Sequence, residues 1–207
     1  MDMATIRKLR AKVFAHTHEY VQTQREEKPS YDDKFRLTPT LCGRTGNAIV
    51  LREDCLHVAR EFATEHARVL LLNMGNPKFP GGGVRAGRGA QEEELSRRTD
   101  LMTFLEPHSK TLYPLSPGAC IIAKRVRVLK GDEECGYEPL AESDQFDIDI
   151  LTCCALEKPL LVWSKDSAEP RLSPQSELYM RMRIRYLLDQ RCPTKSKEGD
   201  RHRWMQR

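Results

Sequence analysis

The sequence lacks the patterns of a membrane or exported protein. Its longest apolar runs span four to six residues, whereas a helix that crosses a bilayer needs roughly 20. The first residues, Met1–Thr5, lack the apolar stretch of a signal peptide. We therefore expect an intracellular protein, in the cytoplasm or the nucleus, that makes no contact with a membrane.

The cysteines and histidines show no metal-ligand spacing. The cysteine count is odd, no two cysteines stand in C-x-x-C order, and Cys153 and Cys154 are adjacent. These facts argue against a zinc site and against a disulfide framework. Free thiols in a reducing compartment are the better interpretation. We expect neither a metal nor a cofactor.

The positive charge of the chain is confined to one end. The net charge is +4, but residues 181–207 alone carry nine Lys or Arg against three Asp or Glu. The rest of the chain is slightly acidic. Such an end could touch nucleic acid, but it offers one Trp and no recognisable binding module. We favour a solvated basic tail over residues 193–207 and do not expect nucleic acid as a partner.

Apolar periodicity alternates between helix and strand along the chain. Helical spacing recurs over 5–22, after Asp54, over 92–105 and over 174–190. Strands are predicted over 47–51, 69–73, 120–129, 146–154 and 160–163. The polar stretch 24–34 is typical of a loop. Strands interleaved with helices predict one layered α/β domain over residues 1–192.

The densest signal lies directly after the strand 69–73. A glycine triplet, Gly81–Gly83, is followed after seven residues by Gln91 and three glutamates, Glu92–Glu94. Glycines leave the backbone amides open to close approach, and carboxylates add acid–base chemistry. The order of strand, Asn73, glycine triplet and carboxylates therefore predicts a site for a sugar phosphate.

Two other interpretations compete for this glycine loop. A flexible surface loop does not often contain five glycines within nine residues, because ordering them costs conformational entropy. A dinucleotide fingerprint formally fits residues 81–86, but that motif turns directly from strand into helix. Here residues 76–80 intervene, and Gly87 and Gly89 would interrupt the helix, so we reject this interpretation.

The sequence around the triplet resembles the microbial type of poly(ADP-ribose) glycohydrolase, a macro-domain-like protein. That family's signature is a glycine triplet, a spacer close to the seven residues found here, and Gln-Glu-Glu. The run Asn73–Gly83 and the flanks Tyr113–Leu115 and Phe146–Thr152 are similar as well. The resemblance covers about residues 5–190. It implies a three-layer α/β/α fold with a mixed sheet and an N-terminal helical extension.

The resemblance also assigns an activity and roles to residues. It implies a glycosidase that hydrolyses ribose–ribose O-glycosidic bonds and releases ADP-ribose, with Glu93 as the general acid and Glu92 holding a ribose hydroxyl. The implied partners are poly(ADP-ribose) and ADP-ribosylated proteins. The implied substrate contacts are Asn73, Asn76, Gly81, Gly82, Gly83 and Gln91. For Asn76 a plain turn role is equally open, because Asn-Pro often starts a turn.

Two electrostatic effects oppose each other at the glutamates. A helix N-terminus stabilises ionised carboxylates, but a general acid needs its proton. Adjacent glutamates and a substrate diphosphate favour protonation by like-charge repulsion. The sequence alone leaves open which effect wins.

The C-terminal part departs from the family pattern. A strand and a Gly-Ala-x-Gly-Cys-Gly type of phosphate loop should follow the helix 174–190, but a basic stretch follows Cys192 instead. We expect C-terminal strands to be missing, through a truncated gene, an altered reading frame or a degenerate family member. The hypotheses are therefore an active glycohydrolase, an inactive ADP-ribose-binding module or a truncated remnant, and, more weakly, a nucleic-acid binder through 181–207.

Overall fold

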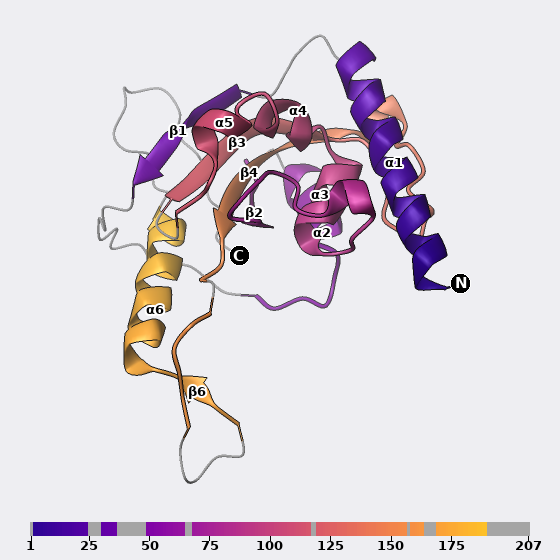
Figure 1. Cartoon of the computed structure of the whole chain (residues 1–207). Helices are drawn as coiled ribbons and strands as arrows, with labels where there is room; N and C mark the ends of the chain where they lie inside the picture. The colour runs from indigo at the N-terminus through magenta and orange to yellow at the C-terminus, as the bar shows by residue number, and fades with distance from the viewer. Residues whose placement is uncertain are drawn as a thin grey trace, which may run out of the picture.

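A long N-terminal helix lies along one flank of the protein. The computed structural model describes residues 2–24, 30–36, 49–64, 68–116, 119–156, 158–163 and 169–189. Helix α1 (Met3–Gln24) begins where the Asp2 carboxylate accepts hydrogen bonds from the amides of Ala4 and Thr5, at 2.8 and 3.0 Å. Figure 1 shows it beside the rest of the body. The helix expected over 5–22 is confirmed. No described helix is long and apolar enough to cross a membrane.

Among the described residues, four strands form one mixed sheet in the order β1–β3–β4–β2. Strand β3 runs antiparallel to β1 and β4, whereas β2 pairs parallel with β4. The strands are β1 (Ser30–Arg36), β2 (Leu70–Gly75), β3 (Ala119–Val128) and β4 (Phe146–Cys154). This mixed sheet and the N-terminal helix confirm the expected macro-domain-like α/β fold.

One loop prediction and two strand predictions need correction. The polar stretch 24–34 is not all loop, because from Ser30 it belongs to β1, where pairing with β3 overrides the polar composition. Residues 160–163 do not extend the main sheet, because β5 (Leu161–Val162) pairs with β6 (Arg171–Leu172) in a separate ribbon. Of the strand expected over 47–51, residues 49–51 are not strand, and the rest lies outside the described residues.

The helix expected over 92–105 is two helices, α3 (Gln91–Arg98) and α4 (Leu101–Leu105). Between them Thr99 is extended, with φ −131° and ψ 171°, and bridges to Val128 at the end of β3. Asp100 then accepts a hydrogen bond from the Arg127 amide at 2.8 Å. Tertiary pairing with the sheet therefore breaks an apolar pattern that is continuous in the sequence.

The two faces of the sheet are packed differently. Leu71 of β2 and Ile150 of β4 join the main hydrophobic core, which also takes in residues of α2 (Cys55–Thr64), α3 and α4. Leu151 and Cys153 of β4 point to the opposite face and form a smaller cluster with Cys120. The alternation of strand side chains thus directs one set of residues toward the helices.

Helix α1 also touches the end of the glycine loop, which ends in the short helix η1 (Val84–Ala86). Gly87 follows η1 with φ +68°, and a Cβ at this position would stand 1.9 Å from the backbone oxygen of Arg7. Only glycine lets the two backbones approach so closely. The helix is therefore packed directly against the loop that carries the site.

The C-terminal described part is an arm that projects away from the sheet (Figure 1). It contains β5, β6 and helix α6 (Pro174–Asp189), which confirms the helix expected over 174–190. Ser173 precedes the helix, and its hydroxyl oxygen accepts a hydrogen bond from the Ser176 amide at 3.2 Å. The tail proposed for 193–207 lies outside the described residues, so the domain boundary at 192 stays a prediction.

Candidate active site

Glu93 caps the helix that carries it. Helix α3 follows Ala90, whose side chain has no oxygen to cap the helix. Instead Oε2 of Glu93 accepts a hydrogen bond from the Ala90 amide at 3.1 Å. Its other oxygen, Oε1, accepts one from the Gly83 amide at 2.8 Å. With 6% of its surface exposed, Glu93 joins the helix start to the glycine loop.

Glu92 is bound in the same way, but to the other end of the loop. Its Oε2 accepts a hydrogen bond from the Asn76 amide at 2.7 Å, and its Oε1 accepts one from the Gly81 amide at 3.0 Å. Only 4% of its surface is exposed. Two neighbouring carboxyl groups thus fold the segment 76–83 around themselves.

Burial decides the protonation of Glu92. Desolvation raises its pKa from 4.5 to about 7, although the hydrogen bonds from Asn76, Gly81 and the Asn73 side chain act in the opposite direction. The negative charge of Glu93 adds to the increase. At Glu92 burial, an effect not considered from the sequence, is the largest cause, and together with like-charge repulsion it outweighs stabilisation by hydrogen-bond donors.

The middle glycine of the triplet makes this arrangement possible. Gly82 has φ +51°, and a Cβ there would lie 2.7 Å from Oε1 of Glu93 and 2.9 Å from Oε2 of Glu92. Any side chain would therefore collide with both carboxyl groups while also straining the backbone. The sequence predicts that the glycine loop approaches a ligand closely. In the structure the loop makes this close approach to the carboxyl groups of Glu92 and Glu93.

This geometry bears on the expected substrate contacts of the triplet. The amides of Gly81 and Gly83 already donate to the glutamates, so a ligand phosphate would have to compete with a carboxylate for them. The assignment of Gly81, Gly82 and Gly83 as substrate-binding residues stays a prediction.

The two asparagines have different surroundings. Asn76 accepts hydrogen bonds at Oδ1 from the amides of Lys78 and Phe79, at 2.8 and 3.3 Å, which is the turn geometry. Asn73 is fully buried, and its Nδ2 donates to Oγ1 of Thr152 at 3.1 Å. Its Oδ1 makes no hydrogen bond to the described residues. The turn interpretation of Asn76 gains support, while a ribose contact by either asparagine stays a prediction.

Gln91 contacts strand β2. Its Oε1 accepts a hydrogen bond from the Met74 amide at 2.9 Å, and its Nε2 donates to the Leu72 oxygen at 2.6 Å. A role in substrate binding for Gln91 also stays a prediction, and these contacts show a structural use of its amide.

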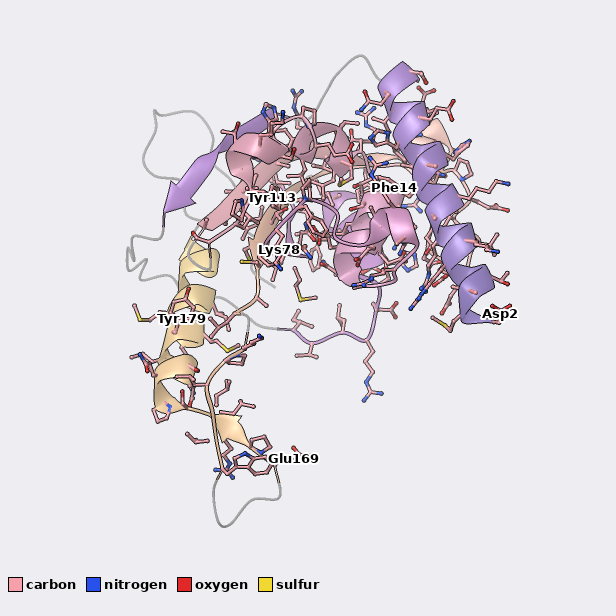
Figure 2. All side chains as sticks on the ribbon, viewed as in Figure 1. Asp2, Phe14, Lys78, Tyr113, Glu169 and Tyr179 are labelled. Carbon is pink, nitrogen blue, oxygen red and sulfur yellow. The ribbon has the colours of Figure 1, made fainter. Side chains whose placement is uncertain are left out.

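Tyr113 belongs to the flank Tyr113–Leu115 that resembles the family, and the sequence gives no sign that its hydroxyl is buried. Its hydroxyl is buried without a hydrogen bond to the described residues, and 8% of the residue is exposed. Burial and then the charge of Glu92 raise the pKa of this phenol, so it stays neutral. The following segment joins the turn after β2, because Leu115 donates to the Pro77 oxygen at 2.7 Å. Figure 2 labels Tyr113 and Lys78, which lie close in sequence to Leu115 and Pro77.

A glycoside hydrolase needs a proton donor beside the bond that it cleaves. Two buried carboxyl groups at a glycine-rich loop fit this requirement. The family model of the microbial-type PARG catalytic domain matches residues 3–129, more than half of the sequence. PARG is poly(ADP-ribose) glycohydrolase, and the chain belongs to this family of glycosidases. No curated protein matches the chain.

Solved structures agree in fold. The chain is similar to poly(ADP-ribose) glycohydrolase from Thermomonospora curvata, with 21% identity, a TM-score of 0.63 and coverage of 88% of this chain and 74% of that chain. The same protein bound to the inhibitor ADP-HPD gives 20% identity and 0.58, with the same coverage. The enzyme from Deinococcus radiodurans in complex with ADP-ribose gives 20% and 0.51, with coverage of 91% and 71%.

Proposed function

We propose that this chain itself hydrolyses ribose–ribose bonds of poly(ADP-ribose), with Glu93 as the general acid. The bond between the anomeric carbon and the bridging oxygen breaks, and the proton of Glu93 passes to that oxygen. Water then adds to the oxocarbenium-like carbon, and its proton returns to Glu93. One observation carries the proposal: both glutamates of the family motif are buried against the glycine loop at the start of α3.

The raised pKa of Glu92 supports catalytic activity near neutral pH. A carboxyl group with a pKa of about 7 holds a proton in roughly half of the molecules at that pH. The two neighbouring carboxyls therefore need not both be ionised when a diphosphate arrives. In the proposal Glu92 holds a ribose hydroxyl of the substrate, while Glu93 faces the scissile oxygen.

The remaining assignments follow from this substrate. The relatives' complexes with ADP-ribose and ADP-HPD support a site for an ADP-ribose group. In the proposal this group belongs to poly(ADP-ribose) or to ADP-ribosylated proteins, and Asn73 and the glycine triplet contact its ribose and diphosphate, as the family resemblance implies. Nucleic acid is not a partner in this proposal. An intracellular location is part of it, because cysteines such as Cys55 and Cys135, which form no disulfide among the described residues, suit a reducing compartment.

Release of ADP-ribose from labelled poly(ADP-ribose) tests the proposal. Glu93→Gln keeps the size of the side chain but has no proton to donate, so we expect a loss of about 10² to 10⁴-fold in rate. Glu142→Gln, on the exposed helix η2 (Glu142–Asp144) outside the site, is the matched control and should keep the wild-type rate.

Three results separate the alternatives. Release that Glu93→Gln abolishes, together with retained binding of ADP-ribose, supports the enzyme with this acid. Binding of ADP-ribose by the wild type without release supports a binding module. A chain that neither binds nor releases ADP-ribose contradicts both. Equal loss in Glu142→Gln would show that the assay reports folding and not the acid.

A further inference from the structure

The side chain of Gln91 occupies a position on the open edge of strand β2. Within the described sheet, β2 pairs on one side with β4 and has no strand on the other. On that open side the Gln91 amide donates to the Leu72 oxygen and accepts from the Met74 amide. The two hydrogen bonds fix which end of the amide is oxygen, because Met74 offers a donor and Leu72 an acceptor.

These two backbone groups are the pair that a neighbouring parallel strand would use. In a parallel ladder, one residue of the neighbour bonds to the carbonyl before and the amide after a given residue. Here that given residue is Asn73, the buried asparagine whose side chain touches Glu92. The carboxamide of Gln91 thus replaces one residue of a strand and closes the ladder around Asn73.

Both ends of the Gln91 amide are engaged by the protein, because its nitrogen donates to the Leu72 oxygen and its oxygen accepts from the Met74 amide. A ligand that displaced either of these groups of β2 would break that bond. The amide therefore has a function inside the protein that competes with the substrate contact expected from the sequence.

The bonds of Gln91 also locate the glutamates that follow it. Ala90 supplies no capping oxygen, so the first turn of α3 is held by the side chains of its own first residues. Gln91 holds it to β2, and Glu92 bonds to the Asn76 and Gly81 amides just beyond that strand. If Gln91 loses its bonds to β2, only the amides of Asn76 and Gly81 hold Glu92 in position.

We propose that Gln91 is a positioning residue, which holds the glutamate pair in place by completing the ladder of β2 and does not contact the substrate. Its effect on turnover rests on the proposed function, but its bond to Met74 can be measured without any substrate. The expected signature is a change in kcat with an unchanged affinity for ADP-ribose, because a residue that only orients the catalytic group leaves the ligand contacts in place.

Gln91→Met tests the anchor, because methionine has a similar length and no amide. We expect kcat to fall at least about tenfold, and KM and the Kd for ADP-ribose to stay within about threefold. Hydrogen exchange at the Met74 amide should become faster, because its acceptor is gone. Gln145→Met is the matched control: Gln145 also donates to a backbone oxygen, that of Leu140 at 3.3 Å, but outside the site. It should change none of these values.

Gln91→Glu adds a readout that general destabilisation would not produce. A protonated carboxyl group offers one donor and one acceptor, as the amide does, whereas an ionised one cannot donate to the Leu72 oxygen. Relative to the wild type at each pH, kcat of Gln91→Glu should therefore recover as the pH falls. The same variant provides the test if Gln91→Met does not fold.

The outcomes are separable from those of the proposed function. A wild type without turnover contradicts the proposed function. In that case hydrogen exchange at the Met74 amide in Gln91→Met still tests whether Gln91 is bonded to β2. Unchanged exchange in Gln91→Met, or a tenfold weaker binding of ADP-ribose with unchanged kcat, overturns the positioning role. A pH-independent ratio for Gln91→Glu overturns it as well.

Discussion

The site region and the C-terminal arm use apolar residues in opposite ways. In the site region, Leu95 of α3 is 0% exposed and packs into the main core between helices and sheet. In the arm, Leu178 of α6 is 60% exposed and Trp163 after β5 is 73% exposed. Both regions have helical or strand-like apolar spacing in the sequence. The difference teaches that spacing identifies an element, while tertiary contacts decide whether that element contributes to a core.

The largest expected effect compares two leucines on two helices. Leu95→Ala should lower the free energy of unfolding by about 3 to 5 kcal/mol, because it opens a cavity in a packed core. Leu178→Ala should change it by about 0.5 kcal/mol or less, because its side chain is mostly in solvent. Chemical denaturation of both variants measures the contrast. Equal losses would mean that the arm is packed in solution.

The next comparison concerns two glycines with positive φ. Gly82→Ala should cost about 3 kcal/mol, because it combines a left-handed backbone with a collision against both glutamates. Gly136 has φ +68° with no atom within 4 Å of a Cβ, so Gly136→Ala should cost only about 1 kcal/mol. Unfolding and ADP-ribose release should both separate the two variants. A Gly82→Ala variant as active as Gly136→Ala would contradict the fit between loop and carboxylates.

A pH series tests the buried carboxyl of Glu92. Its pKa is higher when folded, about 7 against 4.5, so its stabilising contribution is present below pH 4.5 and is lost as the pH rises through 7. Between pH 4.5 and 8 this group should lower the unfolding free energy by about 2 to 3 kcal/mol. Glu92→Gln should lack that decline, which denaturation at several pH values measures.

The exposed Glu177 on α6 supplies the control for this series. Glu177→Gln loses an exposed ion pair with Arg181 but leaves Glu92 intact, so it should keep the wild-type decline. If Glu92→Gln and Glu177→Gln follow the same curve, the Glu92 carboxyl does not titrate as its burial implies.

The smallest expected effect is that of a hydroxyl. Tyr113→Phe removes a buried O–H group that has no partner among the described residues, so the unfolding free energy should stay equal or rise by about 1 kcal/mol. Tyr179→Phe, on α6 of the arm, should stay within about 0.5 kcal/mol. A clear loss of stability in Tyr113→Phe alone would show that the hydroxyl has a partner in solution.

The sequence predicts the elements of the site better than their contacts. Glycine spacing and the strand before it predict that Gly81–Gly83 and the glutamates meet, and the structure brings them together. Spacing does not predict the direction of a backbone N–H or a side-chain amide. For this reason the amides of Gly81, Gly83 and Gln91, expected to face a ligand, face the protein's own carboxylates and β2.

Two fold predictions failed for the same physical reason. The break at Thr99 and the strand that starts at Ser30 both depend on pairing with β3, which lies far away in the sequence. Local composition favours a continuous helix in the first case and a loop in the second. Long-range hydrogen bonding overrides both preferences, and no local pattern reports it.

The contact of Gly87 with Arg7 has a consequence for the N-terminal helix. The glycine loop is held in two places. Gly81 and Gly83 bond to the glutamates, and Gly87 packs against α1. A chain that lacks α1 would keep every glycine and carboxylate of the motif, but it would lose the contact of α1 with Gly87. Such a chain would have to order the glycine loop each time it binds a ligand, and the lost conformational entropy would weaken binding. Helix α1 therefore supports the loop that carries the site and is not a mere appendage to the domain.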